Sequence, residues 1–221
     1  MTADPHRDQR VLAAGHEISD AAGAVILLHG RGATAEDILG LGREFERPEF
    51  ALLAPQAAGN SWYPYSFLAP IGQNEPWLTS ALNKVKKLAD EISDCGIPRE
   101  KIVVAGFSQG ACLACEFVAR NPSRHGALIA FTGGLIGPPG MQFRYSGSLS
   151  GDPIFLGSGD PDPHVPWQRV EETAAVLSTM GAQVTLRRYA GMSHSVSRQE
   201  VAETRQLLSS VLHRASINSN S

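Results

Sequence analysis

The sequence predicts an α/β fold, a mostly parallel sheet with helices on both faces. Apolar segments of strand length alternate with helical patterns, and most of them are continuously apolar, as strands covered on both faces are. The composition is that of a globular protein, with 43% hydrophobic and 19% charged residues. One alternating pattern over 221 residues predicts a single domain spanning 1–221, without a separate cap domain.

Six segments have the length and composition of strands. The last of them alternates polar and apolar residues, which is typical of a strand near the edge of a sheet. In chain order they are Val25–Leu28, Phe50–Leu53, Lys101–Phe107, Ala127–Thr132, Pro153–Leu156 and Gln183–Tyr189.

Helical patterns fill the gaps between these segments. Thr34 and Asp37 are spaced as a capping box, and the helix that they open is expected to end near Arg47-Pro48. Apolar residues then recur at helical spacing from Leu78 to Ile92. The last two helices are expected to begin at Pro166 and at Ser197 with Glu200, and residues 1–10 and 215–221 are expected to be flexible tails.

Charge and hydropathy exclude several classes of partner. A formal net charge of −3 without a basic stripe argues against nucleic acid and against acidic lipid surfaces. The longest aliphatic run, Ala24–Leu28, is too short to cross a bilayer, so no stable membrane insertion is expected. The first residues lack the layout of a secretory signal, which predicts a cytoplasmic protein.

The three cysteines fit a reducing compartment. Cys95, Cys112 and Cys115 are odd in number, which argues against a disulfide framework. Cys112 and Cys115 form a C-x-x-C pair, but no second cysteine or histidine pair stands at the spacing of a metal site. We therefore interpret them as small buried helix residues and expect neither a metal nor a cofactor.

The segment Gly106-Phe107-Ser108-Gln109-Gly110 matches G-x-S-x-G. An apolar strand precedes it and a helix of small residues follows, which is the context of a nucleophile elbow. Such a turn lifts the serine hydroxyl above the sheet, and side chains at positions 106 and 110 would collide with neighbouring backbone. The helix that begins there also directs free N–H groups at an oxyanion beside Ser108.

A serine nucleophile needs a histidine base and an acid that orients the histidine. Asp162 follows the strand that ends at Leu156, and His194 follows the strand that ends at Tyr189. Both therefore lie at the same sheet edge as Ser108, where they can converge. Asp160 is the alternative acid and His164 the alternative base.

Four segments together resemble the phospholipase/carboxylesterase family of α/β-hydrolases, to which the acyl-protein thioesterases belong. They are Leu28–Gly32, Gly106–Gly110, Gly159–Pro166 and Gly191–His194, and the similarity runs from about Val25 to Leu212. The resemblance implies an α/β-hydrolase fold and a catalytic triad of Ser108, Asp162 and His194. It also implies that the backbone N–H groups of Arg31 and Gln109 form the oxyanion hole. The eukaryotic thioesterases of this family have an apolar residue after His-Gly. This sequence has Arg31 at that position, which resembles the bacterial esterase branches of the family.

Two features near the first predicted strand, a glycine motif and a histidine, need a separate interpretation. Gly30, Gly32 and Ala35 match part of a dinucleotide fingerprint, but the acidic residue expected at the end of the second strand is replaced by Ala54–Ala57. His29 is interpreted as a histidine that supports the neighbouring loop.

Two long loops are expected to wall the substrate pocket, residues 57–75 and 133–152. The candidate substrate-binding residues in them are Trp62, Tyr65, Phe67, Leu135 and Met141. Apolar walls favour an acyl chain or an aryl group. The Arg31 guanidinium either selects an anionic substrate or ties down its own loop.

These features predict a serine carboxylesterase that hydrolyses carboxylic esters of short to medium acyl chain through an acyl-enzyme on Ser108. An acyl-protein thioesterase or a lysophospholipase would use the same triad. The alternative of another class is a hydrolase-fold protein that binds without catalysis. The expected partner is a small-molecule ester or thioester, and the sequence leaves open whether a homodimer forms.

Overall fold

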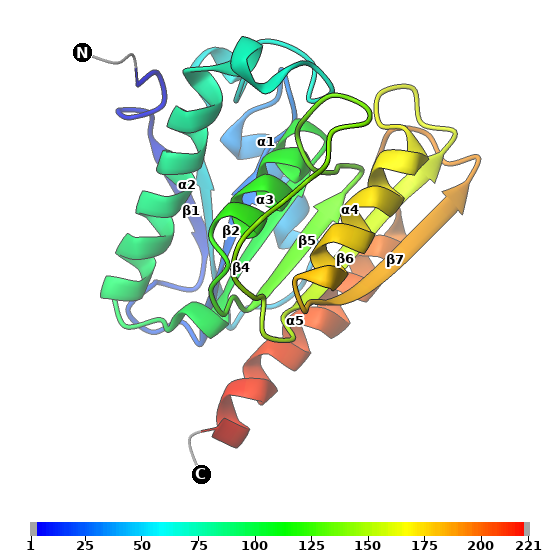
Figure 1. Cartoon of the computed structure of the whole chain (residues 1–221). Coiled ribbons are helices and arrows are strands. Elements are labelled where there is room, and N and C mark those ends of the chain that lie inside the picture. The colour runs from blue at the N-terminus through cyan, green and yellow to red at the C-terminus, as the bar shows by residue number, and fades with distance from the viewer. Residues whose placement is uncertain (1–3, 219–221) are drawn as a thin grey trace.

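The computed structural model describes residues 4–218, with side chains up to Arg214, and shows the α/β-hydrolase architecture that the sequence predicts (Figure 1). Within these residues a seven-stranded sheet has the order β1-β3-β2-β4-β5-β6-β7, and only the β1–β3 pair is antiparallel. The strands are β1 (Val11–Gly15), β2 (Gly23–Leu28), β3 (Phe50–Pro55), β4 (Ile102–Phe107), β5 (Ala127–Phe131), β6 (Pro153–Asp160) and β7 (Gln183–Ala190).

Residues 4–218 also form five α-helices and three short 3-10 helices, and all but the last helix lie between strands in the sequence. The α-helices are α1 (Ala35–Arg43), α2 (Trp77–Asp94), α3 (Gln109–Arg120), α4 (Trp167–Thr179) and α5 (Arg198–Asn218). The 3-10 helices are η1 (Ala58–Asn60), η2 (Ile71–Asn74) and η3 (Arg99–Lys101). None of the described helices is both long and apolar enough to span a bilayer.

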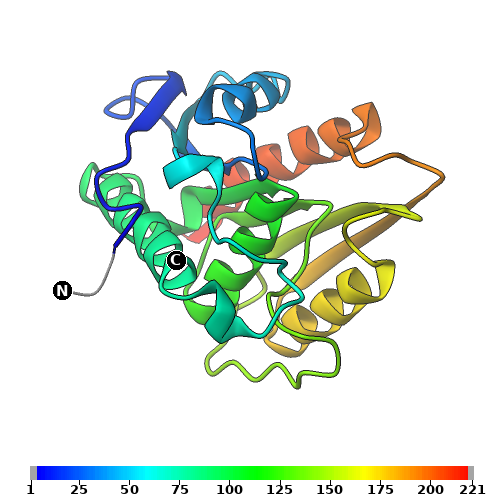
Figure 2. The ribbon, with the colours of Figure 1, turned by 90° about the horizontal axis from the view of Figure 1, so that it is seen from above.

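The helices cover both faces of the sheet. Figures 1 and 2 show α2, α3 and α4 on one face and α1 and α5 on the other. Each face carries its own apolar cluster, and every residue of the central strands β2 and β5 is buried. The continuous apolar runs of the sequence are therefore explained by strands that are covered on both sides.

The predicted capping boxes are confirmed at two helix starts. At α1 the Thr34 side chain accepts from the Asp37 N–H while the Asp37 carboxylate accepts from the Thr34 N–H. Ser197 and Glu200 repeat the arrangement before α5. Helix α1 ends at Arg43, one turn before the residue that the sequence predicted.

The sequence reading was wrong about the N-terminal segment. Residues 4–10 are packed rather than loose, because His6 is fully buried and bonded at three atoms. Its N–H donates to Ser80 Oγ (3.0 Å), its Nε2 lies 3.0 Å from Trp62 O, and its Nδ1 accepts from Ala58 N–H (3.0 Å). The next residues form β1, a short strand that no sequence signal had indicated. Residues 1–3 lie outside the described part of the chain.

The expected C-terminal tail is also shorter than the sequence suggested. The backbone of α5 remains helical to Asn218, so residues 215–218 continue the helix. Residues 219–221 lie outside the described part of the chain.

Asp152, directly before β6, is a buried carboxyl whose charge destabilises the fold. Its Oδ2 accepts from the His125 N–H (2.8 Å), whereas its Oδ1 has no partner within residues 4–218. Burial raises the pKa of Asp152 from 3.8 to about 6, although the bond from His125 opposes the shift. Because the folded state then holds the proton more tightly than the unfolded chain, stability present at low pH is lost as the pH rises through about 6.

Asp152→Asn is therefore expected to remove a pH-dependent loss of stability. The amide keeps an acceptor for His125 and cannot ionise, so the variant should gain about 2 to 3 kcal/mol on wild type between pH 4 and pH 7.5. Urea unfolding of both proteins at the two pH values measures this gain. A difference between variant and wild type that is the same at both pH values would contradict it.

Candidate active site

Ser108 sits in the sharp turn between β4 and α3. Its backbone has φ 54° and ψ −117°, a left-handed conformation that is uncommon outside glycine. The turn is close-packed, because a Cβ on Gly106 would lie 2.4 Å from Gly110 backbone atoms and one on Gly110 would lie 2.0 Å from Leu28 O. The two glycines of G-x-S-x-G are thus required by sterics, as predicted.

A continuous hydrogen-bonded relay joins Ser108, His194 and Asp162. Ser108 Oγ lies 2.9 Å from His194 Nε2, and His194 Nδ1 lies 2.8 Å from Asp162 Oδ2. Since a carboxylate can only accept, the proton of the neutral imidazole is on Nδ1 and Nε2 is free to accept from the serine. The three side chains come from the ends of β4, β6 and β7, which the parallel sheet brings to one edge.

Asp162 is held as a carboxylate that faces the histidine. Its side chain is fully buried, and its Oδ1 accepts from the backbone N–H groups of His164 (2.8 Å) and Val165 (2.9 Å). Burial alone would raise the pKa of Asp162, but the N–H groups of His164 and Val165 and the His194 imidazole outweigh it and hold the pKa below its usual value. The carboxylate is therefore charged at neutral pH.

The two alternatives that the sequence left open are resolved by geometry. Asp160 does not face the histidine, because its carboxylate pairs with Arg188, whose Nε donates at 2.6 Å. His164 lies edge-on to the His194 ring, with ring centroids 4.7 Å apart. Phe107 contacts His194 as well, with centroids 5.0 Å apart, so the imidazole is held between two rings.

The backbone N–H groups of Arg31 and Gln109 belong to residues that line the same cavity as Ser108. Gln109 is the first residue of α3, and first-turn N–H groups have no acceptor within their own helix. Arg31 follows β2, and within residues 4–218 its N–H donates to no backbone oxygen. The helix dipole adds positive potential at the cavity, so the arrangement can bind an oxyanion.

The side chains of Arg31 and Gln109 hold the loop that follows η1. Arg31 Nη1 donates to Pro64 O (2.9 Å), and Arg31 Nη2 donates to Tyr65 O (2.6 Å). Gln109 Nε2 donates to Tyr63 O (2.8 Å), while its Oε1 accepts from Trp62 N–H (3.0 Å). Of the two roles considered for the Arg31 guanidinium, this geometry favours loop anchoring.

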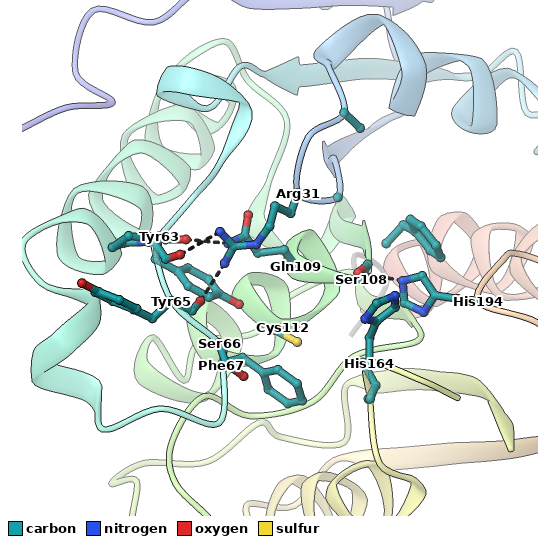
Figure 3. A pocket seen from close by; sticks show the side chains of 15 residues that line it. Arg31, Tyr63, Tyr65, Ser66, Phe67, Ser108, Gln109, Cys112, His164 and His194 are labelled. Atoms are coloured by element: carbon teal, nitrogen blue, oxygen red, sulfur yellow. Dashed lines mark hydrogen bonds between the residues drawn. The ribbon is translucent and has the colours of Figure 1, made fainter. Parts of the chain in front are cut away.

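An open cavity of about 500 Å³ lies at Ser108, bounded by loop 57–75 and by residues at the ends of β2, β4, β6 and β7 (Figure 3). Tyr65 and Phe67 line it, as the sequence predicted. Besides Arg31, Ser108 and Gln109, its other polar or aromatic lining residues are Tyr63, Ser66, Phe107, Cys112, His164 and His194.

Three of the predicted substrate-binding residues do not line this cavity. Trp62 is fully buried beneath the loop, with its indole N–H donating to His29 O at 2.9 Å. Leu135 is drawn into the core because Arg169 and Thr173 bond its backbone, at 2.7 Å and 2.9 Å. Met141 folds back on its own turn, where its sulfur packs on Gly137. The prediction is corrected for Trp62, Leu135 and Met141.

The family follows from a comparison with known proteins, in which residues 12–212 match the phospholipase/carboxylesterase family. The chain belongs to the phospholipase/carboxylesterase family. This agrees with the resemblance of its four motifs and with the relay at the sheet edge.

Proteins similar to this chain come from both bacteria and eukaryotes. A crystal structure of a phospholipase/carboxylesterase from Dyadobacter fermentans is 44% identical, with a TM-score of 0.87, and the match covers 91% of this chain and 96% of that one. A probable carboxylesterase of Oryza sativa subsp. japonica is 28% identical, and the match covers 80% of this chain and 73% of that protein. Acyl-protein thioesterase 1 of Debaryomyces hansenii is 30% identical over 58% of this chain. The match covers 55% of that relative, so this chain spans only about half of its length.

Sequence reasoning missed several lining residues of this family member, among them Cys112, His164 and Tyr63. Cys112 is one helical turn after Ser108 on α3, so its side chain faces the same cavity, and the spacing of four residues could have shown this. His164 had been considered only as a base. Tyr63 stands between two predicted residues, and nothing in the sequence distinguishes the directions of neighbouring loop side chains.

His29 and the C-x-x-C pair have structural surroundings. His29 is fully buried, with Nδ1 2.8 Å from Gly30 O and Nε2 accepting from Ala57 N–H at 3.1 Å, so it supports the loop as expected. Cys112 and Cys115 are free and buried in α3. In the described residues no three His, Cys, Asp or Glu side chains form a group that could hold a metal ion.

Proposed function

We propose that this chain is a serine carboxylesterase that hydrolyses carboxylic esters of short to medium acyl chain through an acyl-enzyme on Ser108. The observation that carries the proposal is the relay from Ser108 through His194 to Asp162, which opens into the cavity. Membership of the phospholipase/carboxylesterase family supports the same reaction class.

In the first half-reaction Ser108 Oγ forms a bond to the ester carbonyl carbon while His194 Nε2 takes the hydroxyl proton. Asp162 keeps the imidazole in the correct tautomer and stabilises the imidazolium. The carbonyl oxygen becomes an oxyanion that the Arg31 and Gln109 N–H groups bind. The ester C–O bond then breaks, and His194 gives its proton to the departing alcohol oxygen.

The second half-reaction repeats these steps with water. His194 Nε2 takes a proton from the water, whose oxygen attacks the acyl carbon, and the same two N–H groups bind the new oxyanion. When the C–O bond to Ser108 breaks, the serine recovers its proton from His194 and the carboxylic acid leaves. The cycle consumes one water for each ester and needs no other reactant.

A short to medium acyl chain fits the corrected lining of the cavity. Trp62, Leu135 and Met141 do not extend its apolar wall, which leaves Phe67 and the ring of Tyr63 as the main apolar surfaces of loop 57–75. The cavity volume of about 500 Å³ lies within the range of small-molecule sites.

The proposal predicts an optimum of kcat/KM among the shorter members of an ester series. Wild-type enzyme should hydrolyse p-nitrophenyl butyrate or octanoate better than the palmitate, because a long chain leaves the apolar wall. Initial rates with p-nitrophenyl acetate, butyrate, octanoate and palmitate measure this, with the buffer rate of each ester subtracted. A clear palmitate optimum would contradict the chain-length assignment.

Thioester hydrolysis is the second candidate, favoured by the thioesterase names of several relatives. The triad chemistry is the same, so a panel of esters, acyl thioesters and lysophospholipids decides between the activities. A hydrolase-fold protein that only binds is the candidate of another class, and failure to hydrolyse every member of the panel would favour it.

We propose a single domain that acts on small-molecule esters in the cytoplasm, where three free cysteines are compatible with a reducing environment. Nucleic acid and stable membrane insertion are not part of the proposal. A homodimer is the open alternative to a monomer.

A further inference from the structure

One polar group in the pocket wall has no use in the mechanism above, the hydroxyl of Tyr63. The residue is 1% exposed and lines the cavity, and its hydroxyl has no hydrogen-bond partner within residues 4–218. The Cys112 thiol lies beside it and offers only a weak hydrogen bond, because a thiol is a poor acceptor. Burial raises the pKa of the Tyr63 phenol well above its usual value, so the group is a neutral donor.

A buried hydroxyl without a partner costs free energy unless something else satisfies it. Seven other residues in the described chain carry such an atom, but none of them lines the cavity: Arg47, Glu49, Thr132, Asp152, Tyr189, Glu200 and Thr204. Among the described residues that carry such a buried unpartnered atom, Tyr63 is therefore the one that lines the cavity.

The position of Tyr63 is fixed by its backbone. Tyr63 O accepts from Gln109 Nε2 (2.8 Å) and from Ser61 Oγ (2.9 Å), while Arg31 anchors the residues that follow. In Figure 3 the ring is directed into the pocket toward the Cys112 sulfur. The ring is therefore part of the pocket wall, and its hydroxyl is buried there rather than turned to solvent.

The geometry of the reaction tells which part of the substrate meets this hydroxyl. The departing alcohol must lie within reach of His194 Nε2, since that atom protonates it. Tyr63 lies across the pocket from His194, beyond Ser108 and Cys112 (Figure 3). The part of the ester that reaches Tyr63 is therefore the acyl group.

We propose that Tyr63 is a specificity-determining residue that donates a hydrogen bond to an acceptor oxygen on the acyl chain of the substrate. The preferred substrate class is an ester whose acyl group carries an ether, carbonyl or hydroxyl oxygen, rather than a plain alkanoate. The inference rests on the proposed esterase function and assigns the acyl side of the same pocket.

An oxygen scan of the acyl chain tests the proposal. The probes are p-nitrophenyl hexanoate and three isosteres in which one chain CH₂ is replaced by oxygen: the propoxyacetate, the 3-ethoxypropanoate and the 4-methoxybutanoate. For each ester, kcat/KM of wild type is divided by that of Tyr63→Phe, which cancels the intrinsic reactivity of the ester. We expect a quotient near or below 1 for hexanoate and a quotient about 5-fold higher for one of the oxygen-bearing esters.

The matched control is Tyr189→Phe. Its hydroxyl is also buried without a partner in the described residues, but it belongs to β7 and does not line the cavity. Its quotient should be the same for all four esters. One common quotient for Tyr63→Phe would overturn the proposal, whereas a failure of the esterase function itself would appear as no hydrolysis of any ester.

A second measurement needs no variant. Wild-type kcat/KM of each ester is divided by its rate constant for alkaline hydrolysis, and at least one oxygen-bearing ester should then exceed hexanoate. If every oxygen-bearing ester falls below hexanoate, the wall at Tyr63 does not accept an oxygen and the proposal is wrong, whatever the behaviour of Tyr63→Phe.

Discussion

Ser108→Ala is expected to lower kcat for p-nitrophenyl butyrate by about 10³- to 10⁶-fold while KM stays within a few-fold. The alanine has no nucleophile to form the acyl-enzyme, but the Arg31 and Gln109 N–H groups and the cavity remain. Residual catalysis should therefore come from oxyanion binding and positioning alone. Initial rates at saturating ester measure the loss, and unchanged circular dichroism shows that the variant is folded.

The control for this prediction is Ser193→Ala, next to the histidine in sequence. The Ser193 hydroxyl is exposed and bonds only Ser195 Oγ (3.2 Å) within residues 4–218, so its removal should change kcat less than about 3-fold. Retention of more than a tenth of wild-type kcat in Ser108→Ala would show that the reaction does not pass through this serine.

Asp162→Asn is expected to lower kcat by about 10³- to 10⁴-fold. An asparagine amide facing His194 Nδ1 favours the tautomer with its proton on Nε2, and that nitrogen can no longer accept the proton of Ser108. The charge that stabilises the imidazolium is lost as well. KM should change little because Asp162 does not line the cavity.

Asp160→Asn is the matched control, since the same chemical change is made two residues earlier in the same loop. It weakens only the exposed ion pair with Arg188, so kcat should stay within about 3-fold of wild type. Equal losses in the two variants would mean that the loop is disturbed in general. A larger loss in Asp160→Asn would make Asp160 the acid.

The relay could be predicted from the sequence because its parts are local. The elbow is fixed by Gly106 and Gly110, which are needed wherever a strand turns this sharply into a helix. The acid and the base follow strand ends, and parallel strands bring such ends to one edge. The interior strands were also recognisable, since a strand covered on both faces is continuously apolar.

The pocket wall could not be predicted in the same way, because contacts distant in sequence decide the direction of loop side chains. Arg169, on α4, pulls the backbone of Leu135 into the core, and Gln109, on α3, holds the backbone of Trp62. Loop residues have no period that would distinguish an inward side chain from an outward one, so neighbours such as Trp62 and Tyr63 look equivalent.

The N-terminal correction has a similar cause. Residues 4–10 are polar and contain a proline, which is typical of a tail. Their order comes from His6, which bonds to Trp62 and Ser80 far along the chain. The strand β1 pairs only with β3 at the sheet edge, and its five residues are too few to show a pattern.

The central claim is that Ser108 is activated by His194, and labelling with a fluorophosphonate tests it most directly, because such probes react with an activated serine. Wild-type protein should gain one label, found on Ser108 by peptide mass spectrometry. His194→Ala, with the serine intact, should be labelled at least about 10²-fold more slowly. Labelling of a different serine, or equal labelling rates in wild type and His194→Ala, would contradict the account.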